Sequence, residues 1–267
     1  MCRLVAYLSQ KVIFASEVIN KSSNALVHQS KSAKGGLSRV NADGFGMGWY
    51  DFSVEKEPST YKSIQPAWND LNLVSLSSKL KTHCFIGHVR ASTVGDVAIF
   101  NCHPFAHEET LFAHNGTIKD FSLIKQQIIN ILSLENYSLI RGQTDSEHFF
   151  ALIHHYLSYK PQTTSFSSAV AFAIRKAIYV INDLKAKVGS FDYTRLNFVL
   201  TNGKEMIAVR YSTAHQIQPL MLYYKVSKET IYVASEPLDE TEEEWKEIPE
   251  NHLILISQDL KISFLSL

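Results

Sequence analysis

The chain has 267 residues, of which 45% are hydrophobic, and its 26 basic side chains balance its 26 acidic ones. Because this balance provides no basic field, we expect no nucleic acid partner. Three cysteines, Cys2, Cys84 and Cys102, are too few for a disulfide framework, and they contain no Cys-x-x-Cys pair, so we expect a reducing, cytoplasmic location. The most apolar helical segment, 169–181, is interrupted by two basic residues. We therefore expect no membrane span, which needs about 18–20 apolar residues.

The first residues carry a possible nucleophile. Met1 precedes Cys2, which has a small side chain, and such an initiator methionine is normally removed. Cys2 would then hold a thiol and a free α-amine on one Cα. The thiolate is the attacking species, and an α-amine with a reference pKa of about 7.7–8.0 can take the thiol proton near neutral pH. The alternative is that Cys2 stands second by chance. The apolar run 4–8 predicts a buried strand that would anchor Cys2 in a sheet.

The next segments predict helix, loop and strand. Residues 16–29 have a loose helical periodicity, 31–39 form a polar loop, and 55–81 predict a loop with a short helix near its end. Residues 41–50 contain alternating glycines but continue as a strand. A dinucleotide loop needs a helix directly after its glycines, because the helix N-terminus holds the pyrophosphate. The segment therefore predicts either a tight turn entering a strand or a strand that another backbone or a small ligand approaches closely.

A strand is predicted over 84–90, and it ends at Arg90 beside the hydroxyl groups of Ser92 and Thr93. A guanidinium group in this setting can hold a carboxylate through two parallel hydrogen bonds. The alternative is an ordinary surface salt bridge.

The dipeptide Asn115-Gly116 stands between apolar stretches. Asn-Gly is the strongest short-range signal for a hairpin turn. The alternative is catalytic, because the side-chain amide of Asn115 and the backbone N–H of Gly116 could both donate to a developing oxyanion. Several histidines lie in this region, among them His103 and His107, but Pro104 argues against a helix that would place both on one face. We therefore predict no metal site.

Thr144 and Glu147 have the spacing of a helix capping box, so Asp145 would lie in the first helical turn. The helix dipole favours a carboxylate there, which is either only helix-start chemistry or a fixed negative charge for the ammonium group of a ligand. Helices are predicted over 149–159 and 167–187. Six strands are predicted over 196–201, 206–211, 220–226, 230–234, 252–257 and 262–265. Strands early and late in the chain, with helices between them, indicate a layered α+β domain.

Taken together, the motifs resemble those of the class II glutamine amidotransferases, which belong to the N-terminal nucleophile hydrolase superfamily. The motifs, in chain order, are Cys2, His88-Val89-Arg90-x-x-Thr93-x-Gly95, His114-Asn115-Gly116 and Thr144-Asp145-Ser146-Glu147. The opening Met-Cys-Arg-Leu, the segment 41–50 and Ala234-Ser235-Glu236-Pro237 are most similar to a free-standing branch that includes the γ-glutamyl hydrolase of ergothioneine biosynthesis. The resemblance covers nearly the whole chain and implies one domain over residues 1–267, folded as a four-layer αββα sandwich.

The resemblance also implies roles for the motif residues. Cys2 would be the nucleophile, and its amine would be the base. Arg90, supported by Thr93, would bind the α-carboxylate of a glutamyl substrate, and Asp145 would bind its α-ammonium group. The resemblance assigns the oxyanion hole to Asn115 and Gly116. A glutamyl group is a zwitterion, so one positive and one negative side chain would match its two charges.

The expected activity is cleavage of a γ-glutamyl amide or peptide through a γ-glutamyl thioester, without a cofactor. Biosynthetic members of the family carry a synthase domain, for which this chain has little room. One alternative is therefore a glutaminase that delivers ammonia to a separate synthase or works with a peptidase partner. The other is a catalytically silent glutamyl-binding protein. We expect 240–247 to be an acidic surface loop around Trp245, and 235–237 either lines the pocket or only ends a strand.

Overall fold

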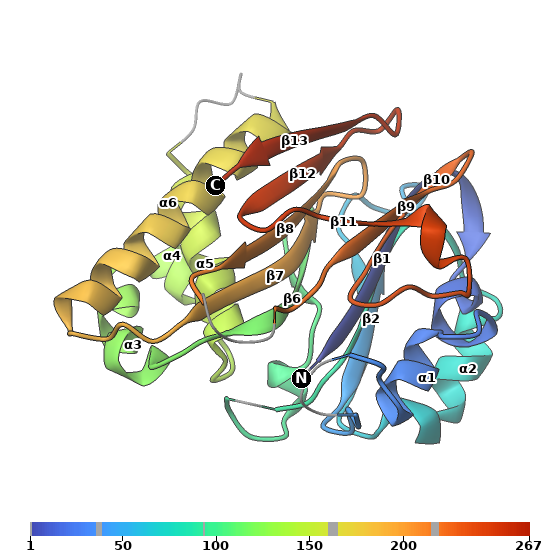
Figure 1. Ribbon diagram of the computed structural model, residues 1–267, viewed down its shortest axis with the longest axis horizontal. Helices are drawn as coiled ribbons and strands as arrows, with labels where there is room; N and C mark the ends of the chain where they lie inside the picture. Colours follow the sequence, from blue (N-terminus) through green and yellow to red (C-terminus); the bar gives the residue numbers. More distant parts are fainter. Residues whose placement is uncertain (1, 36–38, 93, 160–164, 215–218) are drawn as a thin grey trace.

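The protein is built on two antiparallel sheets (Figure 1). The computed structural model describes residues 2–35, 39–92, 94–159, 165–214 and 219–267. The larger sheet has seven strands, in the spatial order β11 (Trp245–Glu247), β9 (Tyr223–Val226), β10 (Thr230–Ala234), β1 (Arg3–Phe14), β4 (Lys81–Val89), β2 (Phe45–Trp49) and β3 (Ser59–Ser63). The smaller sheet has six strands, in the order β13 (Ile262–Ser266), β12 (His252–Ile256), β8 (Met206–Ser212), β7 (Thr194–Thr201), β6 (Thr110–Ile118) and β5 (Phe105–His107).

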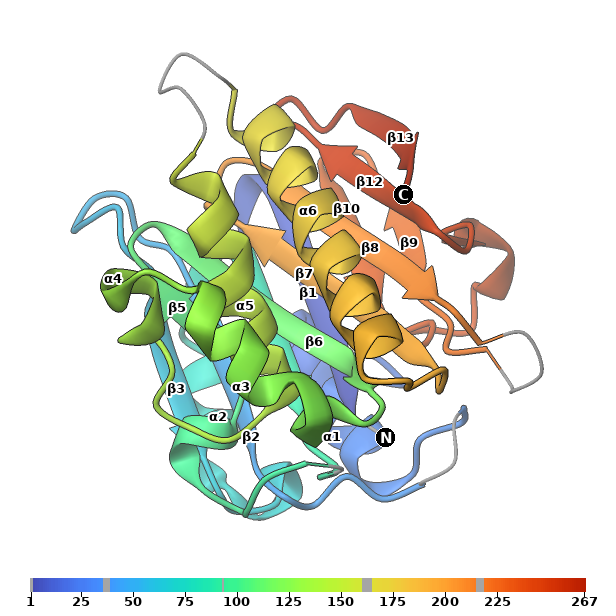
Figure 2. The same cartoon turned by 90° about the vertical axis from the view of Figure 1, so that its left-hand side faces the viewer.

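Helices cover the outer face of each sheet, so the layers are helix, sheet, sheet and helix (Figures 1 and 2). The larger sheet is covered by η1 (Glu17–Lys21), α1 (Leu26–Lys31) and α2 (Leu71–Ser77). The smaller sheet is covered by α3 (Phe121–Ile131), α5 (Asp145–Leu157) and α6 (Phe166–Lys187). The remaining short helices are η2 (Ala67–Asn69), η3 (Ile99–Asn101), α4 (Leu134–Tyr137) and η4 (Glu242–Glu244). The four-layer αββα sandwich predicted from the sequence is confirmed.

Strand β1 lies near the middle of the larger sheet, between β10 and β4. Its side chains alternate in direction, as the pleat of a strand requires. Leu4 and Ala6 pack in the core between the sheets, whereas Val5 and Tyr7 pack against the helices. The predicted strand over 4–8 is confirmed, and it places Cys2 directly before the first residue of a central strand.

Strand β6 follows the same alternation on the opposite sheet. Leu111 and Ala113 face the core between the sheets, and Phe112 faces the helices. Asn115 is two residues beyond Ala113, so its side chain points to the same face of the sheet. It pairs with Asn197 of β7 and therefore lies within the strand. The hairpin turn weighed for Asn115-Gly116 is wrong, because the pairing of β6 with β7 continues to Ile118.

Some predicted elements differ from those observed. The segment 16–29 forms two short helices, η1 and α1, separated by residues 22–25. Helix α3 was not predicted. Residues 240–247 are not a simple surface loop, because Trp245 opens strand β11 and its side chain is only 6% exposed. Trp245 is buried because β11 pairs with β9 at the edge of the larger sheet. None of the helices that the structure describes has the length and apolar character needed to cross a membrane.

Candidate functional site

Cys2 lies directly before β1, and its thiol meets the chain just after β4. The backbone N–H of Ala91 donates to Cys2 Sγ over 3.3 Å, and Sγ lies 3.4 Å from the Ala91 carbonyl oxygen. β1 and β4 are neighbours, with Arg3 opposite Val89, so the sheet itself sets this contact. Burial raises the pKa of the Cys2 thiol, and the Ala91 hydrogen bond and the charge of Arg90 partly oppose this shift. The thiol therefore needs a base to become a nucleophile near neutral pH.

Arg90 is buried directly after β4, and its guanidinium group is held by its own loop. Nη1 donates to the Asp96 carbonyl oxygen, and Nη2 donates to Ser92 Oγ and to the carbonyls of Val94 and Gly95 over 2.9 to 3.1 Å. Throughout the part of the chain that the structure describes, no carboxylate forms an ion pair with Arg90. Arg90 is thus a buried cation without a counter-ion, which is costly unless an anion binds there. Thr93 lies outside the described residues.

Asn115 points into the space between the two sheets and meets Ser235, the residue after β10. Asn115 Nδ2 donates to Ser235 Oγ over 3.1 Å, and the same hydroxyl oxygen accepts the Leu4 N–H over 3.1 Å. This hydroxyl therefore ties the Asn115 amide to the start of β1. A Cβ atom at Gly116 would collide with the Arg195 carbonyl and the His114 ring, so only glycine fits there.

Asp145 opens α5 and is only 4% exposed. The Thr144 side chain caps this helix by accepting the Glu147 N–H, which confirms the predicted start. The Asp145 carboxylate accepts the Ile118 N–H over 2.8 Å and the Ser146 N–H over 2.9 Å. No basic side chain pairs with Asp145 in the described ranges. Asp145 is therefore a buried anion that is fixed to β6, the strand that also carries Asn115.

His114 attaches the start of α5 to β6. Its Nε2 lies 3.1 Å from the Arg195 carbonyl oxygen, which can only accept, so Nε2 carries the hydrogen. Nδ1, 2.8 Å from Ser146 Oγ, must then accept the Ser146 hydroxyl. Burial lowers the pKa of His114, which agrees with a neutral ring. Ser146 is thereby held beside Asp145.

The predicted residues are connected through short chains of contacts. Ala91 joins Cys2 to Arg90, Ser235 joins Asn115 to β1, and Ile118 joins Asp145 to the strand of Asn115. The structure thus gathers around the ends of β1, β4 and β6 a thiol, a side-chain amide, an unpaired cation and an unpaired anion. Within the described ranges, no group of three His, Cys, Asp or Glu side chains is arranged to hold a metal ion.

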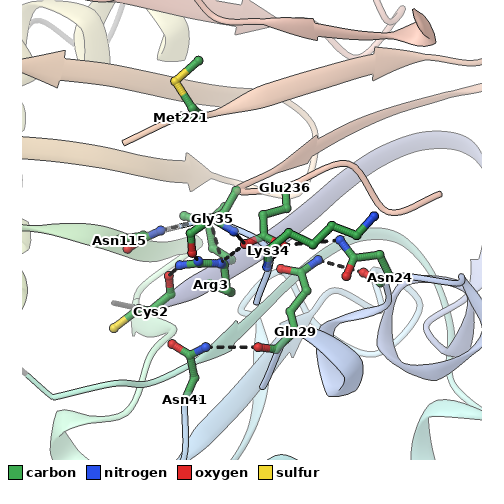
Figure 3. Close-up of polar contacts among 12 residues, drawn as sticks. Cys2, Arg3, Asn24, Gln29, Lys34, Gly35, Asn41, Asn115, Met221 and Glu236 are labelled. Carbon is green, nitrogen blue, oxygen red and sulfur yellow. Dashed lines mark hydrogen bonds and ion pairs between the residues drawn. The ribbon is translucent and has the colours of Figure 1, made fainter. Parts of the chain in front are cut away.

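A second network beside Cys2 was missed by the sequence reasoning (Figure 3). Arg3 Nη1 donates to the Cys2 carbonyl oxygen over 2.8 Å, and Arg3 Nε pairs with Glu236 over 2.6 Å. Glu236 also accepts the backbone N–H groups of Lys34 and Gly35, over 3.0 and 2.9 Å. The carbonyl of Gly35 accepts from Arg3 in return. The sequence did contain one signal for this network, because Arg3 is a charged residue at the start of an otherwise apolar strand. A charge that is buried in this way requires a counter-ion.

The chain matches the family model described as "Glutamine amidotransferases class-II" over residues 12–227, a range that begins after Cys2 and includes the other predicted site residues. It is 31% identical to a probable glutamine amidotransferase, DUG3, of Saccharomyces cerevisiae over 97% of this chain and 82% of that protein. It is 25% identical to the γ-glutamyl-hercynylcysteine sulfoxide hydrolase of Mycobacterium tuberculosis over 97% of this chain and 94% of that protein.

Solved structures agree with this likeness. A glutamine aminotransferase class-II domain protein from Silicibacter pomeroyi superposes with a TM-score of 0.73 at 25% identity, covering 99% of both chains. The glutamine phosphoribosylpyrophosphate amidotransferase of Bacillus subtilis superposes with a TM-score of 0.62 at 16% identity, covering 99% of this chain and 49% of that one. This second match supports the fold only.

Proposed function

Because the chain belongs to the class II glutamine amidotransferases, we propose that it hydrolyses γ-glutamyl amides through a thioester on Cys2. The observation that carries the proposal is a pair of buried charges with no ion pair in the described ranges: Arg90, next to the residue that contacts the Cys2 thiol, and Asp145, fixed to the strand of Asn115. A free glutamyl group offers an α-carboxylate and an α-ammonium group together. One ligand would therefore neutralise both side chains, while its γ-amide extends toward Cys2.

In the proposed reaction, Cys2 is the first residue of the mature chain and its α-amine takes the thiol proton. Sγ then attacks the γ-carbonyl carbon, and the carbonyl oxygen becomes an oxyanion. The Asn115 amide and the Gly116 N–H donate to this oxyanion; removing one such donor typically costs about 2.7–4 kcal/mol of transition-state stabilisation. The C–N bond breaks, and the departing amine takes the proton from the α-ammonium group of Cys2. This leaves a γ-glutamyl thioester.

Water completes the cycle. The α-amine of Cys2 accepts a proton from the attacking water, the C–S bond breaks, and the thiol is reprotonated as glutamate leaves. The name of the mycobacterial relative describes a γ-glutamyl hydrolase, which supports hydrolysis as the fate of the thioester. A glutaminase that passes ammonia to a separate synthase shares every step up to the thioester, whereas a silent glutamyl-binding protein forms no thioester.

The test uses protein prepared with Cys2 as its first residue and 6-diazo-5-oxo-norleucine, an electrophilic glutamine mimic. We expect one covalent adduct by intact mass, located at Cys2 by peptide mapping, and glutamate release from γ-glutamyl-p-nitroanilide. The Cys2→Ala variant should take up no label, and its hydrolysis should fall by at least 1000-fold. Cys84→Ala, a change at a buried cysteine of β4, is the matched control and should retain labelling. Normal hydrolysis by Cys2→Ala would refute the proposal.

A further inference from the structure

A pocket of about 410 Å³ lies where β3 and β5, the edge strands of the two sheets, meet the segment after α4 and the start of α5 (Figure 2). Its lining includes Lys62 of β3, Phe105 of β5 and Arg141 after α4. Among the described residues, the lining contains neither Cys2 nor Arg90, so the pocket is separate from the proposed glutamyl site. Its volume falls in the range of about 300–1,000 Å³ that is typical of small-molecule sites.

Two basic side chains line this pocket without a counter-ion. Lys62 is half-buried, and its ammonium group lies 5.2 Å from the centre of the Phe105 ring. Over the part of the chain that the structure describes, no carboxylate forms an ion pair with Lys62 or Arg141. Burial lowers the pKa of Lys62 to about 8, and nearby Glu147 opposes this shift while the charge of Arg141 adds to it. At pH 7 Lys62 is still mostly protonated, so two positive charges repel each other at one pocket.

The acidic side chain in the lining, Glu147, does not cancel both charges. It is 4% exposed, and its carboxylate accepts the backbone N–H groups of Arg141 and Gly142 over 2.9 and 2.6 Å. With histidine counted as neutral, two positive charges and one negative charge leave the described lining with one net positive charge. An anionic ligand would neutralise that charge and relieve the repulsion between Lys62 and Arg141.

Aromatic rings form much of the apolar part of the lining. Phe105 and Phe150 are buried, and their ring centroids lie 6.5 Å apart. Phe100 also lines the pocket, but its side chain is 52% exposed. Aromatic rings stabilise one another at centroid distances of about 4.5–7 Å. The lining therefore favours a ligand with an aromatic ring, which would cover the exposed ring of Phe100.

The wall of the pocket continues into the loop that holds Arg90. Asn101 accepts the Gln143 N–H over 2.8 Å and donates to the Asp96 carbonyl oxygen over 2.8 Å. The same carbonyl oxygen accepts from Arg90 Nη1 over 3.0 Å. Phe100 directly precedes Asn101, so a ligand packed against Phe100 would act on the segment that orients the guanidinium group of Arg90.

We propose that this pocket binds a small aromatic anion, whose carboxylate or phosphate group pairs with Lys62 and Arg141 and whose ring packs on Phe100. Binding there lowers the KM for γ-glutamyl substrates, because it fixes the segment that orients Arg90. The binding site depends on the pocket alone, whereas its effect on KM rests on the proposed function.

Isothermal titration calorimetry at pH 7 tests the site with benzoate, phenyl phosphate and uncharged benzamide. We expect at least one of the two anions to bind about tenfold more tightly than benzamide, and the tighter anion identifies the preferred acidic group. Lys62→Gln and Arg141→Gln should each raise its Kd about tenfold, because a charge-assisted contact is lost. Lys81→Gln is the matched control, since Lys81 also lies over a phenylalanine ring, 4.5 Å from that of Phe14, but outside the pocket.

Glutamate is added to show where the anion binds, and it should not displace the anion. Displacement by glutamate, equal affinity for benzamide, or a Kd that neither Lys62→Gln nor Arg141→Gln alters would overturn the site.

Steady-state kinetics with γ-glutamylalanine, which has no aromatic ring, test the effect on activity. The bound anion should lower KM at least twofold and leave kcat unaltered, and Lys62→Gln should abolish this effect while Lys81→Gln keeps it. An unaltered KM at a saturating concentration of the anion would overturn the effect and leave the site established. If the anion binds as expected but no γ-glutamyl compound is cleaved and Cys2 takes up no label, the proposed function fails and the site stands.

Discussion

Two buried arginines lie beside Cys2, and they differ in how their charge is compensated. Arg3, 2% exposed, forms an ion pair with Glu236. Arg90, 3% exposed, is held by backbone carbonyls and one hydroxyl group, and no carboxylate pairs with it in the described ranges. Arg3 and Arg90 are the same type of residue and are about equally buried, so the difference between them is the presence of a counter-ion.

This difference indicates different roles. Carbonyl groups satisfy the N–H groups of Arg90 but supply no negative charge, so the positive charge stays available for an anionic ligand. Arg3 is neutralised, and it also donates to the carbonyls of Cys2 and Gly35. Arg3 therefore positions the Cys2 backbone and the loop at Gly35, while Arg90 is suited to bind substrate. We expect substitutions at the two sites to affect different properties.

The largest expected effect is on stability, at Glu236. Glu236→Gln keeps the shape of the side chain but removes the carboxylate that pairs with buried Arg3. Removing one partner of a buried pair typically costs about 3–5 kcal/mol, so we expect the free energy of unfolding to fall by about 3 kcal/mol. Urea unfolding at pH 7.5 measures this.

The matched control is Glu229→Gln, since Glu229 pairs with Lys11 at the surface over 2.7 Å. Exposed pairs contribute less than about 1 kcal/mol. An equal loss of stability in the two variants would mean that the Arg3–Glu236 pair is no stronger than a surface pair, and the comparison between Arg3 and Arg90 would lose its basis.

Arg90→Gln should show the opposite pattern. We expect kcat/KM for γ-glutamyl substrates to fall by roughly 100-fold, about 3 kcal/mol, because a charge-assisted contact to the α-carboxylate is lost. Stability should change less than in Glu236→Gln, because the variant also removes the cost of burying an uncompensated charge. Steady-state kinetics and urea unfolding are measured on the same samples. Arg175→Gln, an exposed change on α6, is the control. Unaltered kcat/KM in Arg90→Gln would exclude a carboxylate-binding role.

The sequence pattern predicted a layered α+β domain, through the apolar runs of β1 and β7 and the helical periodicity of α6, whereas the four-layer order came from the resemblance to a known family. The sequence also contained the signal for α3, whose buried residues Phe121, Ile124 and Ile128 have helical spacing. Asn115-Gly116 could not be placed, because the local preference of Asn-Gly for turns was overridden by pairing with β7.

The site was only partly predictable. Arg90, Asn115 and Asp145 stand in short motifs, so their residue types indicated their chemistry. Arg3 and Glu236 are 233 positions apart, and although Glu236 stands in the motif 234–237, nothing in the sequence pairs it with Arg3. A pocket beside Asn115 combines six separate segments of chain, so its volume depends on tertiary structure alone.

The smallest expected effect is on the pH dependence of stability, through His88, whose pKa the charge of Arg90 shifts. Burial lowers the pKa of His88 to about 3, and the positive charges of Arg90 and Lys62 add to this shift. The unfolded chain has a histidine pKa of about 6.5, so below that pH it binds protons that the folded protein does not. The stability contributed by neutral His88 is therefore present above pH 6.5 and lost as the pH falls toward 3. Between pH 7.5 and pH 5 we expect a loss of about 2 kcal/mol from His88.

Urea unfolding at these two pH values tests the sign and the origin of this effect. His88→Gln should remove about 2 kcal/mol of the difference, whereas His28→Gln, at an exposed position of α1, should remove none. Arg90→Gln should move the folded-state pKa of His88 up toward its unfolded value, so that the protein becomes slightly less sensitive to acid as the pH is lowered further, from 5 toward 3. Glu236→Gln should leave the pH dependence as it is, since the charge of Arg3 is not among those acting on His88. If Arg90→Gln and Glu236→Gln altered the pH dependence equally, the charge of Arg90 would not be what shifts the pKa of His88.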